Sequence, residues 1–235
     1  LYLFNKNEFS LFVKSKYLEV KNDVRMVSYG QKMFYNSVIT FISGSALSIV
    51  ITLTLSTSDI GAYNILLALT GLTSFLMMNL NKVFAPVISK LYHSDKIIEL
   101  NHLYKKTSFL INLLTIPLSL IIVIFADEIL ALYTNDMLEY KIYLLFLIVG
   151  RRLSLAAGSS GTFMIMAGLE KKELKLQTIK AILITSLAFV FVHKYGMMAI
   201  VLLYVIFMLF INISQLIYIQ KHLNISPFSS DLIKL

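Results

Sequence analysis

The stretch Met197–Ile219, MMAIVLLYVIFMLFINISQLIYI, decides the fold because it contains no charged residue. An α-helix needs about 20 predominantly apolar residues to cross the roughly 30 Å hydrocarbon core of a bilayer. Only a closed β-barrel competes with helices in lipid, and its strands of about ten residues alternate apolar and polar side chains. The sequence shows no such alternation, so the stretch predicts a transmembrane helix.

Five further apolar stretches of similar length precede this one. They are Met33–Leu55, Ala62–Asn79, Ser108–Ala126, Ile142–Leu169 and Leu176–Val192. Hydrophobic residues make up 57% of the chain and charged residues 14%, whereas a soluble domain has about 45–50% and 25%. We therefore predict an all-α polytopic membrane protein with six transmembrane helices. The fourth stretch is longer than a simple span, and the fifth contains Lys180.

The segments between the stretches alternate in charge. Asn81–Lys106 and Glu170–Lys175 carry several lysines, whereas Ser56–Gly61 and Asp127–Tyr140 carry acidic residues and no Lys or Arg. Lysine and arginine are enriched in cytoplasmic loops of membrane proteins. Six spans and this bias together predict that both termini are cytoplasmic. The same bias explains the net charge of +8, so nucleic acid is not an expected partner.

Three regions are predicted along the chain. Residues 1–32 are basic and contain no run long enough to span a bilayer, which indicates an amphipathic cytoplasmic linker on the membrane surface. Residues 33–220 form the transmembrane lobe, and residues 221–235 form a cytoplasmic tail. In the loop sequence LYHSDKIIELNHLYKK, Ile97, Leu100 and Leu103 recur at helical spacing. That spacing predicts an amphipathic helix lying on the inner leaflet.

Two arginines in the fourth stretch are the sharpest candidates for function. A charge at bilayer depth costs at least about 2.5–3.5 kcal/mol, so such residues usually face the interior of a helix bundle. Arg151 and Arg152 could therefore face a hydrated cavity, or they could snorkel to the outer interface. Adjacent helical residues point about 100° apart, so at most one is expected to face a cavity squarely. Lys180 is interpreted as an interfacial anchor.

Polar residues also recur in the second stretch, where Asn64, Ser74 and Asn81 share one helical face. This face either packs closely against a neighbouring helix or lines a wet cavity. The chain has no cysteine, which excludes disulfides and cysteine chemistry. Its four histidines form no pair at metal-ligand spacing. We predict no catalytic residue, metal or other cofactor.

Short motifs occur in a characteristic order from Ile60 onward. They are Ile60-Gly61-Ala62-Tyr63, then Asn81, Phe84, Pro86, Leu91-Tyr92, Glu99-Leu100 and Leu103, then Pro117, Ala126-Asp127-Glu128-Ile129-Leu130, Gly158 to Gly168 with Lys171-Lys172, and Tyr195-Gly196 with Ala199. In order and spacing they resemble the C-terminal half of bacterial polysaccharide flippases. These are the Wzx-type O-antigen transporters of the MATE-like multidrug/oligosaccharidyl-lipid/polysaccharide superfamily. The stretch SALSIVITLTL departs from that family, whose members often carry an Asp-Arg pair there.

The resemblance implies one six-helix lobe of a two-lobe transporter, with an N-terminal lobe as partner; a start at Leu1 rather than Met fits this. It implies flipping of polyprenyl-pyrophosphate-linked oligosaccharide across the bacterial inner membrane for O-antigen or capsule biosynthesis. The chain would then be a transporter and not an enzyme, with the lipid-linked oligosaccharide and membrane lipid as partners. Arg151 and Arg152 are the expected pyrophosphate ligands. Expected partners of sugar hydroxyls are Asn64, Ser74, Asn79 and Asn81.

Two alternatives stay open. A MATE-type drug or ion antiporter would favour acidic residues inside the spans, and the six stretches have almost none. A membrane glycosyltransferase or polymerase using the same lipid carrier would need an acidic pair on a substantial outer loop. Asp127-Glu128 is the only outside candidate, and its loop is short.

Overall fold

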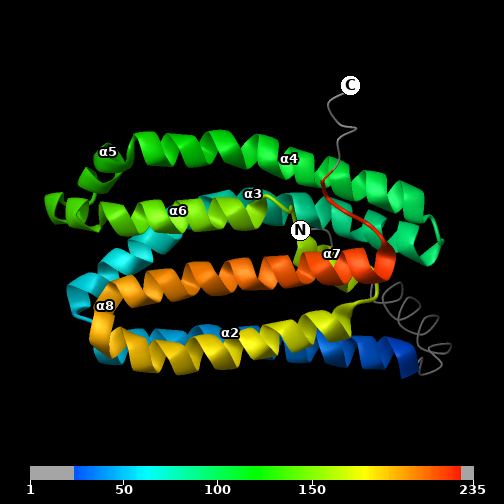
Figure 1. The fold of residues 1–235 in the computed structure, drawn as a ribbon, viewed down its shortest axis with the longest axis horizontal. Helices are drawn as coiled ribbons and strands as arrows, with labels where there is room; N and C mark the ends of the chain where they lie inside the picture. Colours follow the sequence, from blue (N-terminus) through cyan, green and yellow to red (C-terminus); the bar gives the residue numbers. More distant parts are fainter. Residues whose placement is uncertain (1–23, 229–235) are drawn as a thin grey trace, which may run out of the picture.

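The computed structural model describes residues 24–228, and their regular structure is entirely helical. The long helices lie side by side along one axis (Figure 1). In chain order they are α2 (Val24–Thr54), α3 (Thr57–His93), α4 (Ile97–Ile124), α5 (Ala126–Ala131), the 3-10 helix η1 (Asn135–Tyr140), α6 (Lys141–Leu155), α7 (Ser160–Met166) and α8 (Glu170–Leu223). The predicted all-α class is confirmed. Residues 1–23 of the predicted linker and residues 229–235 of the predicted tail lie outside the described residues, although α2 already begins at Val24 and α8 extends to Leu223.

Helix α8 is a hairpin rather than one rod. It contains 54 residues, and Gly196 interrupts it with a φ of 58° and a ψ of −142°. Only glycine adopts such a conformation without a clash of Cβ. The chain reverses there, so that residues 170–195 (the first arm) and residues 197–223 (the second arm) run antiparallel (Figure 1). The two arms contain the fifth and sixth apolar stretches.

Four helical segments of the described chain are long and apolar enough to cross a membrane. They are Thr57–His93, Ile97–Ile124, Asn135–Met166 and Glu170–Leu223. Large hydrophobic side chains are exposed on their surfaces, as expected for a lipid-facing protein. Because α8 supplies two arms, these segments contain five of the six predicted stretches. The remaining stretch lies in α2, whose 31 residues are long enough to span; that α2 crosses the bilayer stays a prediction.

The prediction of a surface helix between the second and third spans is wrong. Only Ser94–Lys96 separate α3 from α4, and Ile97 begins the long α4. The periodic apolar residues Leu100 and Tyr104 are fully buried inside the protein. The ring of Tyr104 stacks on that of Phe163, with centroids 4.2 Å apart. The apolar face was correctly recognised, but it packs against protein and not against the leaflet.

Two apolar cores stabilise the two ends of the bundle. The core at the end that holds α5 and Gly196 includes Tyr63, Leu66, Ile148 and Ile200. The core at the other end includes Leu100, Phe163 and Ile219. Between them, α6 and both arms of α8 carry polar side chains, so the bundle has a polar layer between two dry ones.

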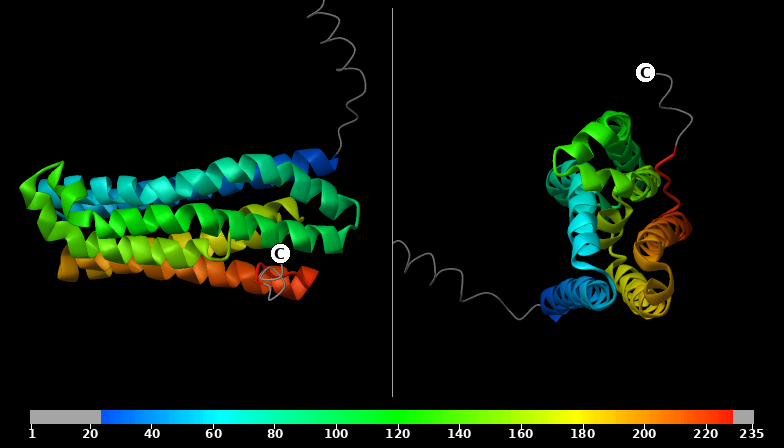
Figure 2. Two further views of the ribbon diagram at one scale, coloured as in Figure 1. Left: turned by 90° about the horizontal axis from the view of Figure 1, so that it is seen from above. Right: turned by 90° about the vertical axis from the view of Figure 1, so that its left-hand side faces the viewer.

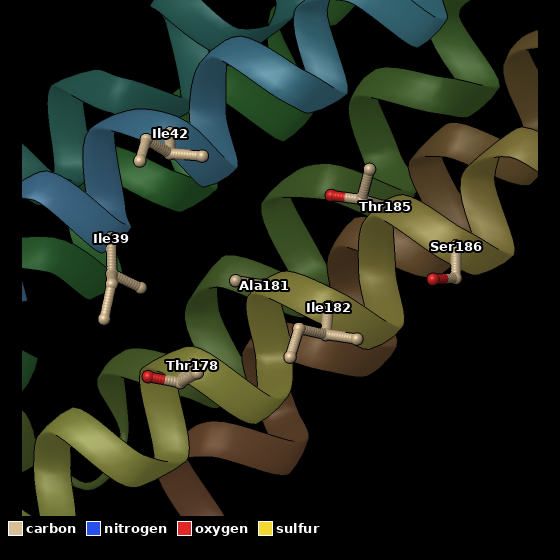
Figure 3. Close-up of a pocket in the computed structure, with 7 residues that line it drawn as sticks. All are labelled: Ile39, Ile42, Thr178, Ala181, Ile182, Thr185 and Ser186. Carbon is tan, nitrogen blue, oxygen red and sulfur yellow. The ribbon is translucent and has the colours of Figure 1, made fainter.

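Helix α2 lies at the edge of the bundle and packs mainly on the first arm of α8 (Figure 2). A shallow groove of about 360 Å³ separates the two helices. Figure 3 shows Ile39 and Ile42 of α2 on one side of this groove and Thr178, Ile182 and Thr185 of α8 on the other. The polar layer lies elsewhere, against α3, α6 and α7.

Candidate functional site

The fourth apolar stretch is a broken helix, which explains its length. Helix α6 ends at Leu155 and α7 begins at Ser160, and Gly158 between them has a φ of 69°. A break inside a membrane helix frees backbone carbonyls, and these must find partners because no lipid group can bond them. The partners come from α4.

One face of α4 supplies hydrogen-bond donors to the free backbone carbonyls at the break. Tyr104 Oη donates to the carbonyl of Ala157 at 3.1 Å, and Ser108 Oγ lies 3.4 Å from the same oxygen. Asn112 Nδ2 donates to the carbonyl of Ala156 at 3.1 Å. The three side chains are spaced four residues apart, so they lie along one stripe of the helix. Helix α4 therefore holds the broken segment in place.

The two arginines point to different helices. Arg151 donates to Tyr204 Oη, and its guanidinium lies 5.6 Å from the centre of the Tyr204 ring. Arg152 instead donates to Asn112 Oδ1 and to Thr115 Oγ1, the latter at 3.4 Å. Arg151 is ten residues into α6, about 15 Å along its axis. Both side chains therefore bond to other helices of the bundle, Arg151 to α8 and Arg152 to α4.

A cavity of about 310 Å³ lies beside Arg151, between α3, α6, α7 and both arms of α8. Its charged lining residues are Arg151, Lys180 and Glu173, and most other lining side chains are hydroxyls and amides. Two cations against one carboxylate leave one net positive charge. Nε of Arg151 is buried and has no hydrogen-bond partner among the described residues. The cavity therefore combines a formal excess of positive charge with a guanidinium donor that is unpaired within the described chain.

Glu173 is the buried carboxylate of this cavity and is only 3% exposed. Gln215 Nε2 lies 2.9 Å from each of its two oxygens, and Gln177 Nε2 donates to Oε1 at 2.7 Å. Gln215 belongs to the second arm of α8, whereas Glu173 and Gln177 belong to the first. These bonds therefore tie the two arms together.

The amide network continues from α8 into the broken helix. Ser160 Oγ at the start of α7 donates to Gln215 Oε1 at 2.6 Å. Asn212 Nδ2 donates to Ser154 Oγ of α6 at 2.6 Å. Gly161 permits this approach, because a Cβ there would lie 3.0 Å from Gln215 Nε2. The cavity wall is thus one connected hydrogen-bonded surface.

This arrangement adds to one sequence-based interpretation and corrects another. Lys180 lines the cavity, and its role as an interfacial anchor stays a prediction. Glu173, assigned to an inside loop, is buried in the cavity wall. The missed signal was the spacing of Glu173, Gln177 and Lys180, which places all three on one face of the first arm. Asn212 and Gln215, three residues apart in an otherwise apolar span, were a second missed signal.

Of the six predicted substrate ligands, only Arg151 lines this cavity. Asn64 is exposed on α3, Asn81 is half-buried, and Asn79 Nδ2 donates to the carbonyl of Phe75 in its own helix. Ser74 Oγ is buried without a hydrogen-bond partner in the described structure. It lies one turn before Met77, the α3 residue that lines the cavity.

The acidic pair considered for an enzyme lies elsewhere, at the end of the bundle. Asp127 and Glu128 are exposed, and Asp127 accepts a hydrogen bond from Lys141 Nζ at 2.6 Å. This ion pair joins α5 to the start of α6. Within residues 24–228, no cluster of three His, Asp or Glu side chains could hold a metal ion.

Comparison with known proteins gives a family. The sequence model of the polysaccharide biosynthesis protein family matches residues 12–141, which is 130 of the 235 residues. Neither curated proteins nor solved structures gave a match. The matched region includes α3 and α4, and so the α4 side chains that bond the broken helix, whereas the break itself follows the matched region. The chain belongs to the polysaccharide biosynthesis protein family.

Proposed function

We propose that the chain is one lobe of a MATE-like, Wzx-type flippase of the bacterial inner membrane. It moves polyprenyl-pyrophosphate-linked oligosaccharide from the inner to the outer leaflet for surface polysaccharide biosynthesis. The observation that carries the proposal is the net cationic, amide-lined cavity between the two apolar cores of a membrane bundle. The match to polysaccharide biosynthesis proteins supports the substrate class.

The cavity fits the chemistry of such a substrate. Arg151 offers a planar guanidinium fork, which matches phosphate oxygens in two-pronged geometry. Lys180 of the first arm of α8 adds a second positive charge to the lining. Gln177 and Asn212 present amides of the kind that bond sugar hydroxyls, and the α3 residues Asn64 and Asn81 remain candidates along the path toward the partner lobe. The polyprenyl chain needs no polar site because it stays in the bilayer.

Alternating access would come from movement of this lobe against the N-terminal lobe. A reconstituted assay tests the proposal. Vesicles that contain the complete transporter and a lipid-linked oligosaccharide labelled in the glycan should expose label on the far side of the bilayer. The proposed function would be refuted if the labelled lipid flipped equally fast in protein-free vesicles. It would also be refuted if the transporter did not flip the pyrophosphate-linked lipid.

This lobe alone is expected to be inactive. All residues that line the cavity belong to this lobe, and the resemblance is confined to one half of a two-lobed family. A partner lobe is therefore needed to complete the substrate path. Expression of residues 1–235 in cells that lack the transporter should restore no surface polysaccharide, whereas co-expression with the N-terminal lobe should. Full restoration by this chain, with no dimer detected on cross-linking, would contradict the expectation.

The orientation of the bundle is tested by cysteine labelling. The chain has no native cysteine, so each introduced thiol reports alone. Thr57→Cys and Asp136→Cys should react with an impermeant reagent added outside the cell, and Lys172→Cys should react only after permeabilisation. The lysine bias of the loops is the reason for this expectation. Outside labelling at residue 172 would overturn the predicted cytoplasmic termini.

A further inference from the structure

We propose that Arg152 is a positioning residue that holds the broken helix in register, and not a ligand of the transported lipid. The inference deepens the proposed function, because it divides the tasks of two neighbouring arginines at one site. Arg151 lines the cavity. Arg152 is not among the lining residues and faces α4 instead.

The contacts of Arg152 form a closed ring. Its guanidinium donates to Asn112 Oδ1, and the amide nitrogen of Asn112 donates to the carbonyl of Ala156 at 3.1 Å. The backbone N–H of Ala156 returns to the carbonyl of Arg152 at 3.1 Å. The same amide nitrogen also donates to the carbonyl of Ser108 in its own helix at 2.7 Å, so Arg152 and Ser108 hold the Asn112 amide from its two ends. Loss of Arg152 removes the partner of the amide oxygen and weakens the hold on the carbonyl of Ala156, which is costly to leave unpaired in the membrane.

The ring sits directly before the cavity wall. Ala156 is followed by Ala157 and Gly158, and Ser159 and Ser160 then line the cavity. Ser160 connects onward to Gln215 and so to Glu173. A shift at Ala156 therefore displaces the wall that the substrate would meet. A charged donor suits this task, since its hydrogen bonds are about twice as strong as neutral ones.

A double-mutant cycle tests the inference through a readout that does not depend on transport. In the complete transporter, Ser159→Cys supplies a reporter in this lobe, and its rate of reaction with a small thiol reagent is measured in membranes. Any cysteine of the N-terminal lobe is first replaced. Arg152→Met and Asn112→Leu should each change that rate about fivefold, within the range of couplings in one hydrogen-bond network. The double variant should show the effect of one alone, because both changes break the same ring.

The matched control is Arg151→Met combined with Asn112→Leu, whose effects should multiply because Arg151 contacts Tyr204 and not Asn112. Asn112→Asp covers the case in which Arg152→Met does not fold. It keeps Arg152 paired but removes the donor to Ala156, and it should change the rate as Asn112→Leu does.

Multiplicative effects of Arg152→Met and Asn112→Leu would overturn the inference. So would loss of flipping in Arg152→Met with an unchanged reporter rate, since that pattern belongs to a substrate ligand. If neither the wild type nor any variant flips lipid-linked oligosaccharide, the proposed function is refuted. The double-mutant cycle can still be measured in that case, because its readout is the reaction rate of the thiol at residue 159.

Discussion

Replacing Arg151 by Gln is expected to slow flipping of the lipid-linked oligosaccharide by roughly 10- to 100-fold. The variant loses the charged hydrogen bonds to pyrophosphate, each of which contributes about 1.5–3 kcal/mol, and about 1.4 kcal/mol corresponds to one factor of ten in rate. Arg151→Lys should recover part of the rate, because it keeps the charge but not the fork. The rate is measured in vesicles that contain equal amounts of each variant.

The matched control removes the same charge from an exposed position. Lys106 lies on the surface of α4 and outside the cavity, so Lys106→Gln should leave flipping within about twofold of wild type. The assignment of Arg151 fails if Gln is tolerated there. It also fails if a thiol at residue 151 reacts with an outside impermeant reagent while the transporter is locked open to the inside.

Gly158→Ala is expected to produce the largest loss of stability. Two penalties add at this position. The φ of 69° strains any residue with a Cβ by about 1–2 kcal/mol. The added Cβ would also lie 2.3 Å from Ser108 Oγ and 3.0 Å from its Cα, and overpacking of this kind costs about 1–3 kcal/mol. We expect a clearly lower Tm in detergent and less protein in the membrane.

Alanine substitutions at two other glycines separate the two penalties that add at Gly158. Gly71 lies in helical backbone with nothing within 4 Å of an added Cβ, so Gly71→Ala should be neutral or stabilising by about 0.5–1 kcal/mol. Gly196 has the same open space but a φ of 58°, so Gly196→Ala should carry the backbone strain alone, about 1–3 kcal/mol. The expected order of Tm runs from Gly71→Ala down through Gly196→Ala to Gly158→Ala. Equal values for the first and last would show that α4 does not pack against the break.

The apolar stretches could be predicted from the sequence because hydrophobic length is a property of each segment alone. The cavity could not, because it depends on which helical faces meet. Glu173 stands among lysines in the sequence, and only its helical spacing from Gln177 and Lys180 indicates that it shares their face. Only the reversal at Gly196 brings Gln215 back to it.

The amphipathic segment at the start of α4 likewise shows that a sequence pattern does not identify the partner of a buried face. The spacing of Ile97, Leu100 and Leu103 shows that one face is buried, but spacing does not say by what. Leu100 is fully buried in a core to which α3, α7 and α8 also contribute side chains. The break after Leu155 was hidden for a related reason, since its carbonyls are bonded by α4, more than 40 residues earlier in the chain.

The reversal at Gly196 allows both arms of α8 to enter the bilayer during synthesis as one hairpin. The first arm carries Lys180, and a charge near a helix centre costs about 2.5–3.5 kcal/mol on insertion. The second arm is charge-free from Met197 to Ile219, and each of its Leu, Ile, Val and Phe residues favours insertion by about 0.3–0.6 kcal/mol. Gln215 donates to both oxygens of Glu173 within the same hairpin. The buried carboxylate and the donor that bonds both its oxygens therefore belong to one contiguous hairpin, so their pairing depends on the turn at Gly196 and not on the assembly of distant helices.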